Sequence, residues 1–112
     1  MSANRRRGEI SAVIDGRECT LCLTLGSLAE LENAFAARDL TALAERFSSG
    51  KLSARDLMEV IAAGLRGAGL PVQASDVAAM KIEGGATGAA AIVAELLQVT
   101  FGAAEAAASP DP

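Results

Sequence analysis

Histidine, tryptophan and tyrosine are absent from this sequence of 112 residues, and three phenylalanines supply all of its aromatic rings. Without histidine, the chain lacks the most common general base and the most common metal ligand of proteins. With so few rings, a core must consist mainly of leucine, isoleucine, valine and alanine. Because 51% of the residues are apolar, that material is sufficient for one modest domain.

Long hydrophobic runs are also missing. The longest uncharged, apolar stretch is residues 84–94, which is 11 residues, whereas a membrane span needs about 20. No apolar segment typical of a secretory signal follows the first basic residues. We therefore expect a cytoplasmic protein that does not bind a membrane.

Basic residues are in the minority and unevenly placed. The net charge is −4, yet three of the ten basic residues are Arg5, Arg6 and Arg7, so the remainder of the chain carries 7 basic and 14 acidic residues. An acidic body repels phosphate backbones, and we do not expect it to bind nucleic acid. Residues 1–7 are predicted to be a disordered basic arm. The arginines are candidates for contact with an acidic partner, although a solvated arm without a partner is the favoured interpretation.

An alternating pattern begins just after the arm. Ile10, Ala12 and Ile14 share one face of a predicted strand. Asp15-Gly16 then predicts a type I′ turn, because both central positions of that turn need positive φ. A second alternating run places four residues on one face: Cys19, Leu21, Leu23 and Leu25. The two runs predict a β-hairpin, which must pack on other elements to be stable in water.

Helix signals fill the rest of the chain up to Gly102. Four helices are predicted to start at side chains that can cap them: Ser27, Asp39, Ser53 and Ser75. Ser27 with Glu30, and Ser53 with Asp56, have capping-box spacing. A last helix is predicted over about residues 87–101. The predicted fold class is α+β, an N-terminal β-hairpin followed by a compact bundle of four to five short helices. It forms a single domain over residues 8–102, with a disordered tail over residues 103–112.

The two cysteines, Cys19 and Cys22, stand in a C-x-x-C arrangement. Residues three apart on a strand point to opposite faces, and a redox C-x-x-C instead begins a helix. A zinc site needs about four ligands, which two cysteines without histidine do not supply. We therefore interpret both as small apolar fillers.

No other motif predicts chemistry. Residues 83–88 are glycine-rich before a helix, but neither a strand nor a P-loop lysine accompanies them, so a turn is favoured. Carboxylate pairs such as Asp56 with Glu59 are predicted to face solvent. A helix-turn-helix built on residues 54–66 would present two early acids and no Asn, Gln or Lys to read bases. We expect no enzyme activity, no cofactor and no small-molecule substrate.

The remaining prediction is a surface for protein partners. An unpaired edge of the hairpin can accept a strand from another chain. Coverage of that edge by a helix of the same chain is the slightly favoured alternative. The candidate contact residues on the hairpin are Leu21, Leu23 and Leu25, which are equally candidates for the core.

The order of segments resembles a family of small proteins encoded in the tail gene cluster of alphaproteobacterial gene transfer agents, which are phage-derived particles. The resemblance spans about residues 4–102 and is carried by "NRRRGEI", "IDG", "LCLTLGSLAELE", "LSARDL", "IAAGLRGAG" and "AAIVAELLQVTFG". It implies a role in building a long phage-like tail.

Three hypotheses follow from that resemblance and the residues together. The leading one is a non-enzymatic tail assembly chaperone that binds the tape-measure protein. The second is a structural component of the tail tube or its ends. The third is a small regulator that contacts nucleic acid through Arg5, Arg6 and Arg7. The expected partners are the tape-measure protein or other tail proteins, and further copies of the chain. The expected location is the cytoplasm or the assembled particle.

Overall fold

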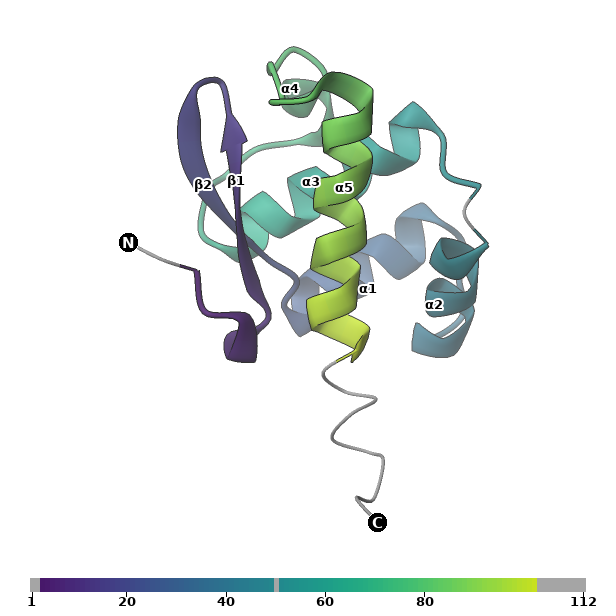
Figure 1. Cartoon of the computed structure of the whole chain (residues 1–112). Coiled ribbons are helices and arrows are strands. Elements are labelled where there is room, and N and C mark those ends of the chain that lie inside the picture. The colour runs from purple at the N-terminus through teal and green to yellow at the C-terminus, as the bar shows by residue number, and fades with distance from the viewer. Residues whose placement is uncertain (1–2, 50, 103–112) are drawn as a thin grey trace.

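The computed structural model describes residues 3–49 and 51–102 (Figure 1). The predicted tail, residues 103–112, therefore lies outside the described residues. A two-stranded antiparallel hairpin precedes five α-helices, which confirms the predicted α+β class. The elements in chain order are η1 (Arg5–Arg7), β1 (Glu9–Ile14), β2 (Arg17–Cys22), α1 (Leu25–Ala34), α2 (Leu40–Ser48), α3 (Ala54–Gly67), α4 (Ala74–Val77), α5 (Gly85–Leu97) and a π-helical turn, η2 (Gln98–Gly102).

The hairpin forms at the predicted place. Asp15 and Gly16 both have positive φ, 55° and 75°, as a type I′ turn requires. The register pairs Ile14 with Arg17 next to the turn and Glu9 with Cys22 at the far end. Strand β2 ends at Cys22, earlier than the sequence pattern predicted.

The caps of α2 and α3 are also as predicted. The Asp39 carboxylate accepts a hydrogen bond from the Ala42 backbone N–H at 2.9 Å. At the start of α3, Ser53 and Asp56 form a full capping box, with distances of 3.1 and 3.0 Å between side chain and backbone. Asp56 is 8% exposed, so the prediction that this carboxylate faces solvent is wrong.

The starts of α1 and α4 differ from the prediction. Thr24, not Ser27, caps α1, and its hydroxyl accepts from the Ser27 N–H at 3.0 Å. The Ser27 hydroxyl instead donates to the Ala63 carbonyl of α3 at 3.1 Å, so Ser27 is buried between the two helices. Gln73 rather than Ser75 occupies the cap position of α4.

Helix α3 is the centre of the molecule, and Figure 1 shows the hairpin, α1, α4 and α5 arranged around it. Its residues from Val60 to Leu65 are all buried. Gly64 lies where α3, β2 and α5 meet, since a Cβ there would stand 2.8 Å from Leu96 Cδ2 and 3.2 Å from Leu21. The hairpin is therefore supported by close packing on the most buried helix of the fold.

The continuous helical segment Gly85–Gly102 consists of α5 and η2 and is longer than the helix predicted over about residues 87–101. Within the described residues it is the one helix long and apolar enough to cross a membrane, with a mean hydropathy of 1.3. Core helices pass the same test, and Val93 and Leu96 of this segment are buried in the core. The expectation that the protein binds no membrane stays a prediction.

Candidate functional site: the edges of the hairpin

The three leucines proposed for partner contacts are separated by the structure. Leu21 is completely buried and Leu23 is 8% exposed, so both belong to the core of the folded protein. Leu25 is 80% exposed, but it begins α1 instead of continuing the strand. The prediction that all three share one strand face is wrong, because the extended cap residue Thr24 turns the chain into a helix.

The arginine arm contains one turn of 3-10 helix over Arg5–Arg7. The expectation that residues 1–7 are disordered stays a prediction. Asn4 holds this turn, because its backbone oxygen accepts from the N–H groups of Arg7 and Glu9, both at 3.0 Å. The Arg7 guanidinium lies 3.9 Å from the Glu9 carboxylate and stays largely exposed. The turn therefore presents positive charge beside the start of β1.

The two cysteines project to opposite faces of β2, as predicted. The Cys19 thiol lies on the side of α3, whereas the Cys22 Sγ is 3.8 Å from the Arg7 carbonyl oxygen. Both are free thiols. Burial raises the pKa of Cys22, the nearby Glu9 carboxylate raises it further, and Arg7 partly opposes them. Within residues 3–49 and 51–102, no cluster of three or more possible ligands would hold a metal ion.

Near the turn, the outer edge of β1 is closed by the protein's own chain. Ile14 pairs with Ile82 in an isolated antiparallel bridge. Flanking it, the Asp15 N–H donates to the Lys81 carbonyl at 2.7 Å, and the Glu83 N–H donates to the Val13 carbonyl at 3.3 Å. The Asp15 carboxylate also accepts from the Lys81 N–H at 2.8 Å. A segment that is distant in sequence thus protects the end of this edge next to the turn, whereas the outward groups of Ser11 have no backbone partner within the described residues.

The outer edge of β2 is open over three residues. In a hairpin with a two-residue turn, the pair beside the turn, here Ile14 with Arg17, is hydrogen-bonded, and hydrogen-bonded pairs then alternate with non-hydrogen-bonded ones. The N–H and C=O groups of Glu18 and Thr20 therefore point away from β1. The described part of the chain offers these four groups no backbone partner. At Cys22 the edge is closed, because Gly67 of α3 lies against the Cys22 carbonyl.

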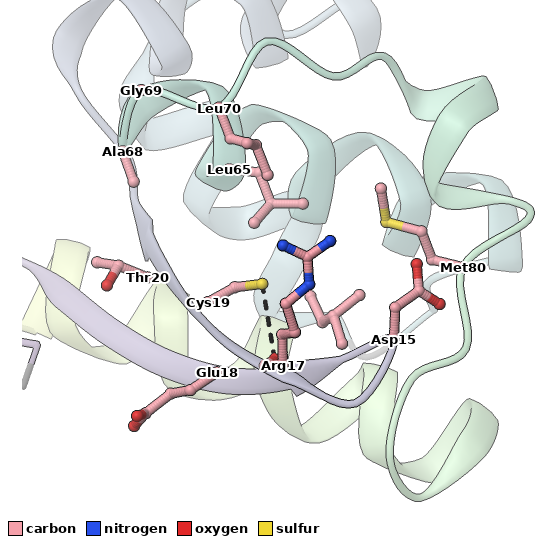
Figure 2. A pocket seen from close by; sticks show the side chains of 11 residues that line it. Asp15, Arg17, Glu18, Cys19, Thr20, Leu65, Ala68, Gly69, Leu70 and Met80 are labelled. Carbon is pink, nitrogen blue, oxygen red and sulfur yellow. Dashed lines mark hydrogen bonds between the residues drawn. The ribbon is translucent and has the colours of Figure 1, made fainter. Parts of the chain in front are cut away.

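A groove of about 450 Å³ runs beside this open edge (Figure 2). Figure 2 shows the side chains of Arg17 and Cys19 directed into the groove, with Glu18 and Thr20 directed away from it. The apolar part of its lining is Ile14, Leu65, Leu70 and Met80. Leu70 is 44% exposed at the rim. The sequence pattern predicted an unpaired edge but not the groove, which depends on residues far apart in the chain.

Arg17 gives the groove a positive charge that is not neutralised. Its guanidinium forms no ion pair within the described part of the chain. Asp15 also lines the groove, but one of its carboxylate oxygens already accepts from the Lys81 N–H. The site therefore combines a free strand edge, an apolar floor and one available cation. Those features are typical of a site for protein segments.

Comparison with known proteins identifies the class of protein. The family model described as "Phage tail tube protein, GTA-gp10" matches residues 7–103, which is most of the chain. The protein belongs to this family of gene transfer agent tail proteins. No curated protein and no solved structure matches the chain.

Proposed function

We propose that this protein is a non-catalytic structural component of the tail tube, or of its ends, in a gene transfer agent. The observation that carries the proposal is the family match over residues 7–103, whose description is a phage tail tube protein. It favours the structural hypothesis over the chaperone hypothesis that the sequence analysis placed first. The protein would be made in the cytoplasm and would become part of the particle.

The surfaces of the fold support this proposal. Subunits that propagate an assembly use at least two different surfaces, because a head-to-tail contact joins unlike patches. The open edge at residues 18–20 and the exposed side chains of Arg6 and Arg7 are different patches on this small domain. Other tail proteins and further copies of the chain are the expected partners.

A chaperone that binds the tape-measure protein is the second candidate, and one observation favours it. A ring of subunits joined by continuous strand pairing uses both edges of each sheet. Here the sheet has two strands, and the edge of β1 is already closed near the turn by residues 81–83. One open edge is suited to holding a single segment of another protein.

Quantitative mass spectrometry of purified particles separates the two candidates. The protein should be measured against the major tail subunits, in particles and in the lysate that produced them. A fixed ratio to the tail subunits in particles is the result expected for a structural component. Abundance in the lysate with near absence from particles would overturn that proposal and favour the chaperone.

A further inference from the structure

We propose that the open edge of β2 and its groove bind one extended segment of another protein, in which an acidic and an apolar residue are two positions apart. The acidic side chain would pair with Arg17, and the apolar one would enter the groove beside Cys19. The inference deepens the proposed function and rests on it, because it names the chemistry of a partner in the tail.

The backbone of Glu18 and Thr20 provides the first part of the site. Their four outward N–H and C=O groups match the groups that an added strand presents. Strand addition would satisfy them without changing the ladder between β1 and β2. Near the turn, the edge of β1 does not offer this opportunity, because Lys81 and Glu83 already hydrogen-bond to Asp15 and Val13.

The groove selects the side chains of the added strand. Directly opposite residues of paired strands point to the same face, so partner residues opposite Arg17 and Cys19 would both face the groove. The residue between them would face away, on the side of Glu18. Next to Cys19 the lining is apolar, with Leu65 below and Leu70 at the rim. An apolar partner side chain is therefore favoured at this position.

Charge complementarity identifies the other partner residue. Arg17 points into the groove without an ion pair, and Glu18 points to the opposite face. Asp15, which lies in the turn, also lines the groove, but its Oδ1 atom already accepts a hydrogen bond from the Lys81 N–H. A partner carboxylate opposite Arg17 would gain charge-assisted hydrogen bonds from the guanidinium. The recognised pattern is thus acidic, any residue, apolar.

The site is short at both ends. The Asp15-Gly16 turn ends the edge on one side, and Gly67 closes it at Cys22 on the other. Paired strands advance by the same distance per residue, about 3.3 Å. A partner segment of about three residues therefore fills the open edge. Specificity then depends on the two side chains that enter the groove.

A displayed library of short random peptides tests the inference with the intact chain. The expected result is enrichment of peptides with an acidic and an apolar residue two positions apart. Thr20→Pro removes one outward N–H and leaves the ladder to β1 intact, so enriched peptides should bind it at least about tenfold more weakly. Ser11 lies directly opposite Thr20 in β1, so Ser11→Pro is the matched control and should bind peptides normally.

Arg17 variants test the charge. Selection against Arg17→Glu should exchange the acidic residue of the enriched peptides for a basic one, whereas Arg17→Lys should keep it acidic. The inference is overturned if no pattern is enriched, or if enriched peptides bind Thr20→Pro as well as the native protein. It is also overturned if Thr20→Pro converts a dimer into a monomer, because the edge then pairs with a second copy. The proposed function is tested separately, by mass spectrometry of particles. A negative peptide selection therefore overturns the binding site without overturning the proposed function.

Discussion

Gly67 of α3 lies directly against the backbone carbonyl of Cys22 at the end of β2. A Cβ atom on Gly67 would stand 1.9 Å from that oxygen and 2.9 Å from the Ser27 hydroxyl oxygen. Hydrogen is therefore the only side chain that fits between the hairpin, α1 and α3. This contact also limits the open edge of β2 to the residues before Cys22.

Replacing Gly67 with alanine should destabilise the protein by about 2–3 kcal/mol, because backbone must move to accommodate the methyl group. Gly26→Ala in α1 is the control, since its Cβ would meet only the Thr24 hydroxyl oxygen at 3.7 Å. That change should alter stability by less than about 1 kcal/mol and in the stabilising direction. Urea unfolding of both variants gives the comparison, and equal midpoints would contradict the close contact.

Leu21 and Leu25 should respond very differently to the same truncation. Leu21→Ala creates a cavity in the core and should cost about 3–5 kcal/mol. Leu25→Ala removes an exposed side chain and should change stability by no more than about 0.5 kcal/mol. Thermal unfolding measures both effects. A large loss at Leu25 would mean that α1 does not begin where the structure places it.

Leu25 also allows a test of partner contact without loss of the fold. Leu25→Asp should leave the unfolding transition in place, because the side chain is exposed. If Leu25 contacts another tail protein, the variant should yield fewer complete particles than native protein in a complementation assay. Native particle yield from a folded Leu25→Asp protein would remove this residue from the contact surface.

Asp56→Ala should destabilise the protein by about 1–2 kcal/mol through loss of a cap and an ion pair. Its Oδ2 atom accepts from the Ser53 N–H at 3.0 Å and lies 3.2 Å from Arg46 Nη2. Arg46→Ala keeps the cap and removes the ion pair, together with the hydrogen bond to the Lys51 carbonyl at 2.8 Å and the contact with the Phe35 ring. Chemical denaturation of the two single variants and the double variant measures the coupling. A coupling energy near zero would contradict a contribution of the ion pair to stability.

Stability should fall at alkaline pH because of Cys22. Its folded-state pKa is raised by burial and by Glu9, so the neutral thiol is the form that the fold favours. The contribution is complete below the unfolded-state pKa of about 8.5 and is lost as pH rises through the folded-state pKa. The measurement is the urea midpoint of native and Cys22→Ser proteins across this range. The difference between them should shrink as pH rises.

Glu9→Gln provides the companion measurement. Removing the Glu9 charge should lower the Cys22 pKa, because a nearby negative charge disfavours the thiolate. Thiolate absorbance in a Cys19→Ser background reports Cys22 alone. An unchanged titration would contradict an electrostatic contribution from Glu9.

Local patterns predicted the hairpin and two helix starts, because those features depend on neighbouring residues. Asp15-Gly16 specifies its turn through backbone conformation, and Ser53 with Asp56 specifies a cap. The start of α1 was mispredicted because Thr24 and Ser27 are both hydroxyl residues that can cap a helix. Packing of Ser27 on Ala63, which is 36 positions away, decides between them.

The groove could not be predicted from local sequence patterns, because segments far apart in the chain form it. Arg17 and Met80 line the same space because the Ile14–Ile82 bridge brings their segments together. The spacing of charges along the chain gives no indication of that pairing. The sequence likewise could not predict that Arg17 forms no ion pair within the described residues, because this depends on where the surrounding carboxylates lie in the fold.

The bridge between Ile14 and Ile82 also has a consequence for synthesis of the protein on the ribosome. Strand β1 emerges early, whereas Lys81, which hydrogen-bonds to Asp15, is 66 positions further along the chain. Until that segment emerges, the outer edge of β1 in the nascent hairpin lacks its final neighbour. Protection of β1 therefore arrives late in translation, after the central helix α3 has been made.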